Sequence, residues 1–290
     1  WKKWGEPQAY LFILPALVPY AIFWLAPMAY VVYLSFTDWD FMAPVKNFVG
    51  WENYRNLLTD SKFYDALKTT CLFALGNVLP SLAGGLLLAL LLNRKLRGAA
   101  FFRTVIFLPW VTPTVAVSIV WAWIYQPRVG LANTVLSWFG IGGLEWTQSP
   151  KTALLAVLIV TVWKGLGWTM VFYLVALQNI PESLHEAAMM EGAGRRQRLM
   201  RITLPLISPT TFFLFMITTI DSIQAYDQIS VLTQGGPSGS TRTLLYLYYE
   251  SAFERFEIGE ASAVAIVLIL LLALISLVSL YVSRRRIHYL

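Results

Sequence analysis

The chain has 290 residues, of which 57% are hydrophobic and only 13% are Asp, Glu, Lys or Arg. A soluble domain typically has about 25% charged residues, so this composition excludes an ordinary soluble protein and favours a membrane protein. The net charge of +6 lies at the ends of apolar segments, so we attribute it to membrane topology and expect no nucleic-acid partner.

Six apolar segments follow one another along the chain, each long enough for a transmembrane helix of roughly 20 residues. They span residues 7–37, 69–93, 104–127, 152–181, 202–220 and 261–283, and the only charged residue inside them is Lys164. Continuous apolar runs are unlike the alternating strands of a membrane β-barrel. We therefore predict an all-α polytopic membrane protein with six transmembrane helices, forming a single domain over residues 1–290.

The first segment is a transmembrane helix rather than a signal peptide, because it is too long and has no small-residue cleavage pattern. The chain starts at Trp1 instead of Met, and we expect further residues before it in the natural protein. Residues 48–70 mix charges with apolar positions and predict either an amphipathic helix on the outer membrane surface or a plain loop. Cys71, the only cysteine, is expected to be a small buried residue.

Lys and Arg near the ends of spans mark the cytoplasmic side of a membrane. Thirteen lie on the side of the N-terminus and eight on the other side. Both termini and residues 179–205 are therefore predicted to face the cytoplasm. On the third span, Trp110, Trp121, Trp123 and Tyr125 are predicted to form an aromatic belt at the outer interface.

Residues 179–205 form a charged segment between two apolar spans. Asn179 is a suitable N-cap, and Glu182 three residues later predicts a near capping box. The first helix is expected to reach Met190, where glycines break it, and a second to run from residue 195 to 202 and stop at Pro205. By pattern alone this is a compact helix-turn-helix or an ordinary basic loop.

The segment contains Glu186-Ala187-Ala188, then Glu191-Gly192-Ala193, then Ile202, Leu204 and Pro205. This string resembles the EAA loop of permease subunits of binding-protein-dependent ABC importers. Longer stretches such as VWKGLGWTMVFYLVALQNIPESLHEAA resemble the sugar-permease branch of that family. Glu191, where Asp is common, and Leu199, where an aromatic residue is common, are mild departures.

The resemblance implies a type I ABC importer permease fold of the six-span kind, with residues 179–205 docking into a separate ATPase. The residues that it assigns to ATPase coupling are Glu186, Ala187, Ala188, Met190, Glu191, Gly192, Ala193, Leu204 and Pro205. It implies as partners a second, non-identical permease subunit, a dimer of ATP-binding cassette ATPases and an extracytoplasmic solute-binding protein. The location is the bacterial cytoplasmic membrane. Turn residues 233–237 would face the binding protein.

Chemistry on the chain itself is not expected. There is no G-x-x-x-x-G-K-[ST] loop for ATP and no HExxH or Cys-His metal set, and His185 and His288 lie at predicted cytoplasmic positions. We therefore expect no catalytic residue, metal or cofactor. An intramembrane enzyme and a scaffold without transport are the alternatives to a permease.

Polar residues inside the spans are the candidates for a solute path, because they are costly to expose to lipid. Lys164 and Asp221 lie about 14 and 12 residues from the inner ends of their spans, roughly 21 and 18 Å deep. We hypothesise that they approach each other or jointly face a cavity.

Thr218, Asp221, Gln224 and Gln228 recur at helical spacing and are predicted to share one face. Their amides and carboxylates suit the hydroxyl groups of a sugar. Trp163, Trp168 and Tyr173 either stack on sugar rings or pack between helices. On the second span, Pro80 is expected to bend the helix, and Asn77, Ser81 and Gly84 either face the path or, through Gly84 and Gly85, pack closely.

The predicted path residues are Asn77, Lys164, Trp168, Tyr173, Thr218, Asp221, Gln224 and Gln228. The expected solute is a sugar or related polyol, with a non-sugar solute such as glycerol-3-phosphate as the alternative.

Overall fold

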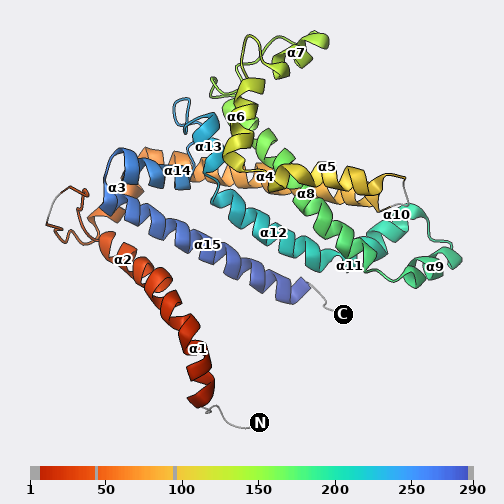
Figure 1. The fold of residues 1–290 in the computed structure, drawn as a ribbon, viewed down its shortest axis with the longest axis horizontal. Helices are drawn as coiled ribbons and strands as arrows, with labels where there is room; N and C mark the ends of the chain where they lie inside the picture. The colour runs from red at the N-terminus through yellow and green to blue at the C-terminus, as the bar shows by residue number, and fades with distance from the viewer. Residues whose placement is uncertain (1–6, 43–44, 94–96, 287–290) are drawn as a thin grey trace. The chain divides into compact units, whose positions relative to one another are not determined.

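A computed structural model describes residues 7–42, 45–93 and 97–286 of the chain (Figure 1). Within these residues all regular elements are helices, and the only β-type contact is an isolated bridge between Thr37 and Phe48. The all-α prediction is confirmed. The apolar segments form helices because their backbone N–H and C=O groups must be paired internally in a lipid environment.

Four stretches of helix in the described residues are long and apolar enough to cross a membrane alone, and two bent helix pairs raise the number to six. The four are Phe12–Leu34, Ser61–Leu92, Ala153–Gln178 and Ile258–Tyr281. They belong to α1 (Pro7–Tyr20), η1 (Ala21–Leu25) and α2 (Ala26–Leu34), which are continuous, and to α4 (Ser61–Leu92), α8 (Ala153–Gln178) and α15 (Ile258–Arg286).

The third span is bent, although the sequence predicted one uninterrupted helix. α5 (Ala99–Val111) and α6 (Thr114–Ile124) meet at 99°. Thr112 between them is extended, with φ −72° and ψ 143°, because a residue before proline avoids the helical region. α6 is followed by α7 (Leu131–Trp138), which projects beyond the end of α6 in Figure 1.

The fifth span is also bent. α10 (Arg195–Arg198), η2 (Leu199–Thr203) and α11 (Leu204–Leu206) run into α12 (Ser208–Ile223) with a 62° bend, and α13 (Asp227–Leu232) follows. The predicted stop at Pro205 is wrong. The chain is helical without interruption from Arg195 to Leu206, with Pro205 next to its end and the π-helical turn η2 before it, and the chain turns at Ile207 instead.

The chain divides into two compact units. The first contains Trp1–Ser61 and Leu247–Leu270, and the second contains Lys62–Tyr246 and Leu271–Leu290. The remaining elements are α3 (Glu52–Thr59) and η3 (Glu250–Glu254) in the first unit and α9 (Glu182–Met190) in the second, with α14 (Leu244–Tyr249) at their junction in the sequence.

In the first unit, α3 is the short amphipathic helix that the sequence left as one of two alternatives, and the second span starts at Ser61, earlier than predicted. The side-chain amide of Asn53 on α3 donates hydrogen bonds to the carbonyls of Ser35 (2.9 Å) and Thr37 (2.8 Å). Asn47 donates from its side chain (3.0 Å) and its backbone (2.9 Å) to Asp38 and so lowers the pKa of that carboxyl group.

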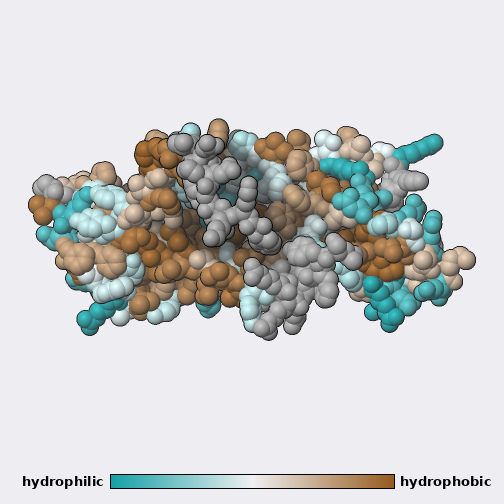
Figure 2. Space-filling view, turned by 90° about the horizontal axis from the view of Figure 1, so that it is seen from below, coloured by the Kyte–Doolittle hydropathy of each residue, from teal (hydrophilic) through white to brown (hydrophobic). Residues whose placement is uncertain are grey.

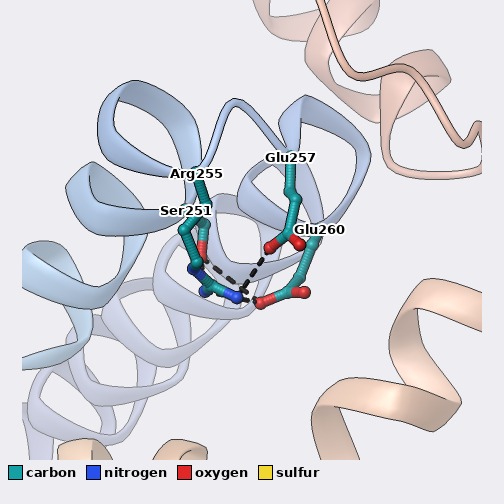
Figure 3. Close-up of polar contacts among 4 residues, drawn as sticks. All are labelled: Ser251, Arg255, Glu257 and Glu260. Carbon is teal, nitrogen blue, oxygen red and sulfur yellow. Dashed lines mark hydrogen bonds and ion pairs between the residues drawn. The ribbon is translucent and has the colours of Figure 1, made fainter.

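Arg255 organises a polar cluster at the start of α15 (Figure 3). Its guanidinium forms ion pairs with Glu257 (2.6 Å) and Glu260 (2.9 Å) and donates to the hydroxyl of Ser251. Burial lowers the pKa of Arg255, but the Glu260 and Glu257 carboxylates outweigh this and raise it above its usual value. The cluster joins η3 to the first turn of α15.

In the second unit, α4 packs closely against α8 through glycines. A Cβ on Gly85 would lie 2.1 Å from the Thr169 hydroxyl oxygen, and one on Gly84 would lie 2.5 Å from a methyl carbon of Leu166. The sequence left two alternatives for this part of α4, facing the path or packing closely against another helix. At Gly84 and Gly85 the structure shows close helix packing. α4 continues through Pro80 without a break.

Much of the surface in Figure 2 is hydrophobic, and large apolar side chains such as Phe23 and Trp24 are exposed. This pattern is expected of helices that face lipid or partner subunits. Cys71 is exposed on α4, so the prediction that it is buried is wrong.

Candidate functional site

A cavity of about 480 Å³ opens in the second unit, within the range of small-molecule pockets. It is lined by α4, α8, α12, α13 and the bend between α5 and α6. Its polar and aromatic lining consists of Asn77, Ser81, Trp110, Thr114, Thr161, Lys164, Trp168, Thr169, Thr218, Asp221, Gln224, Tyr226, Asp227 and Gln228. Seven of the eight predicted path residues are in this set; Tyr173 is not.

Asn77 and Ser81 form the α4 wall of the cavity and hold it to α12. The Asn77 amide donates to the Ser222 hydroxyl (2.9 Å), and the Ser81 hydroxyl donates to the Asn77 oxygen (3.0 Å). Ser222 in turn donates to the carbonyl of Thr218 (2.5 Å). Asn77 is therefore a buried, hydrogen-bonded part of the wall rather than a free polar group.

Lys164 caps the bend of the third span. Its ammonium donates to the carbonyl of Trp110 (3.1 Å) and lies 5.2 Å from the centre of the Trp110 ring. Trp110 is in the last turn of α5, where carbonyls have no partner within the helix and a positive charge is favourable. No ion pair joins Lys164 to Asp221, both of which the structure describes. Both residues line the same cavity. This agrees with the second alternative that we stated from the sequence, in which Lys164 and Asp221 jointly face a cavity.

The four residues predicted to share one helical face do not lie on one helix. Thr218 and Asp221 are on α12, which ends at Ile223, and Gln228 is on α13, where its amide donates to the Thr161 hydroxyl (3.3 Å). The prediction of one continuous helical face is therefore wrong, although all four residues line the cavity. Asp227, which also lines it, was missed because it follows an apolar run and reads as a loop residue.

Two stacked tryptophans form the aromatic side of the cavity. Trp110 and Trp168 have ring centres 5.0 Å apart at 22°, and Trp168 also contacts Phe172. Trp110 was predicted to lie in an interfacial belt, but the bend places it in the cavity lining. Trp163 packs edge-on against Trp121 and is not part of the lining.

Tyr173 does not reach the cavity. It is 1% exposed and packs in an apolar cluster with Met170, Ile207 and Leu214. Tyr173 is therefore not part of the cavity lining, and the structure gives no support to its predicted place on the solute path. Helical spacing could not reveal this, because residues on a helix inside a protein can face either a cavity or a neighbouring helix.

The segment 179–205 joins the two main cavity helices, α8 and α12. Asn179 is the C-cap of α8, which ends at Gln178, and Pro181 stands at the N-cap of α9, so the predicted capping box at Asn179 is not formed. α9 ends as predicted at Met190, because Gly192 adopts φ +80°, a conformation that favours glycine.

The predicted coupling residues mostly lie on the surface of this segment. Glu186, Ala187, Met190, Glu191, Gly192 and Pro205 are exposed, and Ala188, Ala193 and Leu204 are partly buried. Met190 is 90% exposed. Two short helices thus present small, apolar and acidic groups away from the spans.

An all-α chain with four to six candidate spans and a polar cavity in its second unit is the architecture of a membrane transport subunit. Residues 81–289 match the family described as the binding-protein-dependent transport system inner membrane component. The chain belongs to this family and is a permease subunit of an ABC transporter in the inner membrane.

Relatives and a solved structure agree with this membership. The probable ABC transporter permease protein YurN of Bacillus subtilis (strain 168) is 36% identical over 256 residues, 87% of each chain. The trehalose/maltose transport system permease protein MalF of Thermococcus litoralis is 34% identical over 259 residues, covering 89% of this chain and 86% of that protein. A crystal structure of a bacterial alginate ABC transporter in complex with an alginate pentasaccharide-bound periplasmic protein matches with a TM-score of 0.83 and 25% identity, over 96% and 94% of the two chains.

Proposed function

We propose that this subunit forms half of a path for a sugar or related polyol and that a second, non-identical permease subunit completes it. The observation that carries the proposal is the cavity lined by Lys164, Asp221 and the Trp110–Trp168 pair. Asp221 and Gln224 are exposed although they lie at the end of an apolar helix. Such groups are costly in lipid, so they favour a water-filled path covered by another subunit.

The chemistry of the lining favours an uncharged, hydroxyl-rich solute. Carboxylate and amide groups can each engage two neighbouring hydroxyls, and stacked indoles suit the C–H faces of sugar rings. The single ammonium group, on Lys164, is already bound to a carbonyl, while Asp221 and Asp227 both line the cavity. An anionic solute such as glycerol-3-phosphate would therefore meet net negative charge on this half of the path.

The segment 179–205 is the proposed docking surface for the ATPase. Met189 and Met190 are exposed beside Glu186 and Glu191, a combination of apolar and charged groups that suits a specific protein contact. Because α8 ends where this segment begins and α12 follows it, a movement of the ATPase dimer would reach both walls of the cavity. ATP binding and hydrolysis would thus alternate the side on which the path is open.

The proposed orientation places this segment and both termini in the cytoplasm, following the excess of Lys and Arg on that side. The solute-binding protein then docks on the opposite face, where the turn at residues 233–237 lies.

Reconstitution of the chain with its partner subunits in proteoliposomes tests the proposal. We expect uptake of a labelled sugar that requires both ATP inside the vesicles and the solute-binding protein outside. Uptake without ATP, or ATP-dependent uptake of glycerol-3-phosphate with no sugar uptake, would contradict it.

A further inference from the structure

A second cavity, of about 510 Å³, lies at the base of the segment 179–205 and shares no lining residue with the first cavity. It is lined by His185 of α9, Arg195 and Arg198 of α10, Leu199 and Thr203 of η2, and Leu90 of α4. Three of these six residues are basic or titratable to a cation, and none is acidic. This composition selects for an anion.

The two guanidinium groups have no ionic partner within the part of the chain that the structure describes. The Nε atom of Arg198 is buried and has no hydrogen-bond partner there. A buried donor without a partner is unfavourable, so a ligand that accepts its hydrogen bond would be stabilising. The planar guanidinium group of arginine can donate two parallel hydrogen bonds to the oxygen atoms of a phosphate group.

The cavity lies between the loop and the spans. Leu90 is near the C-terminal end of α4, and Thr203 is buried, whereas the exposed tip around Met190 is not part of its lining. The end of an apolar span is also the depth at which lipid headgroups meet the protein.

We propose that this cavity binds a phosphate-bearing anion, with Arg195 and Arg198 holding the phosphate and His185 donating a further hydrogen bond. Leu90 and Leu199 supply an apolar edge that a phospholipid headgroup can use and a free phosphate ion cannot. Basic pockets at the ends of spans are known forms of anionic-lipid site. The assignment is independent of the solute and of the ATPase.

The test compares ligands on the assembled transporter, purified in detergent and titrated by calorimetry. The probes are short-chain phosphatidylglycerol, short-chain phosphatidylcholine and inorganic phosphate. We expect phosphatidylglycerol to bind and phosphatidylcholine not to bind. If inorganic phosphate binds and phosphatidylglycerol does not, with the same dependence on Arg195 and Arg198, the anion is a soluble one. Binding of neither anion, or equal binding of both lipids, would overturn the proposal.

Two double variants supply the matched comparison. Arg195→Gln with Arg198→Gln removes both charges from the cavity and is expected to weaken binding about 25-fold, at about fivefold for each cationic side chain. Arg196→Gln with Arg201→Gln removes the same charge from the same loop outside the lining and is expected to change binding less than about twofold. An equal loss in both variants would show a diffuse surface effect and would reject the site.

Arg195→Gln alone guards against a folding defect, because Arg195 is exposed. It is expected to show about a fivefold loss, and unchanged affinity in this variant would contradict the proposal. Arg195→Lys with Arg198→Lys keeps both charges but loses the paired N–H donors of the guanidinium groups. Its affinity is therefore expected to lie between that of the unchanged protein and that of the double Gln variant.

Discussion

The Lys164 side chain has two structural roles, one at the end of α5 and one in the cavity lining. It pairs with a carbonyl at the end of α5 and contributes the one cationic side chain among the polar groups that line the described cavity. Removing it leaves that carbonyl without its partner and makes the cavity more acidic. A positively charged side chain at a helix C-terminus stabilises by about 0.3–1 kcal/mol at exposed sites and more when partly buried.

Lys164→Met is therefore expected to reduce sugar uptake at least about tenfold, which corresponds to about 1.4 kcal/mol. Asp221→Asn is expected to reduce uptake as well, because it keeps the shape but loses a strong acceptor. Initial uptake rates in proteoliposomes measure both. Lys151→Met, an exposed residue before α8, serves as the control. If Lys164→Met and Asp221→Asn both transport normally, these residues do not belong to the path.

The tryptophans of α8 provide a second comparison between residues of one kind. Trp168 lines the cavity, while Trp163 packs on Trp121 outside it. Trp168→Ala is expected to raise the KM for sugar about two- to tenfold, since stacking of an aromatic ring is worth about 0.5–1.5 kcal/mol and about 1.4 kcal/mol corresponds to a factor of ten. Trp163→Ala is expected to leave KM nearly unchanged. A larger KM effect at Trp163 would contradict the assigned lining.

At the scale of elements, the contact between α4 and α8 depends on glycines that admit no side chain. Gly85→Val places new carbons against Thr169 and the backbone of Met170 and is expected to destabilise the protein by about 1–3 kcal/mol. Ala83→Val adds similar bulk on the exposed side of the same helix and is expected to be nearly neutral. Thermal unfolding in detergent measures both, and equal melting temperatures would contradict the packing described.

The segment 179–205 is an element whose shape depends on one backbone conformation. Gly192→Pro cannot adopt φ +80°, because proline is restricted to φ near −65°, and Glu186→Lys reverses a charge on the exposed face of α9. Both variants are expected to stay in the membrane but to lose most of the co-purifying ATPase and the coupled uptake. Gly194→Ala, at φ −69°, is the control. Normal ATPase recovery in both test variants would refute the docking role.

The local sequence explains why the third and fifth spans bend, but it does not determine the two bend angles. Pro113 explains why α5 stops, and Pro209 follows the turn at Ile207, yet neither proline specifies an angle of 99° or 62°. The angle depends on what the next helix packs against. α6 packs through Trp121 and Tyr125 in an apolar cluster with Ile229 and Ala156, residues that are far away in the sequence.

At the scale of the whole molecule, the orientation across the membrane can be tested with single cysteines. Cys71→Ser removes the natural thiol, and Met190→Cys or Ser238→Cys then adds one at an exposed site, the first on the proposed cytoplasmic side and the second on the proposed outer side. A membrane-impermeant thiol reagent is expected to label Ser238→Cys in intact spheroplasts and Met190→Cys only after permeabilisation. Labelling of Met190→Cys in intact spheroplasts would reverse the proposed topology and remove the ATPase assignment.

The sequence by itself determined the class of fold, the six apolar segments and the transporter family. Lipid forces every buried backbone group to be paired within a segment, so composition and length alone specify membrane helices. The short loop motif around Glu186 and Gly192 is equally local, because a glycine conformation and exposed side chains do not depend on distant contacts.

Only the tertiary structure decided which polar and aromatic residues meet. Trp110 and Asp227 line the cavity while Tyr173 is buried in the core, and no pattern along one helix distinguishes these outcomes. The face that a membrane helix turns toward a cavity is set by its neighbours and by bends such as that at Thr112. Since every face of such a helix is apolar enough for lipid, the sequence pattern carries little information about its rotation.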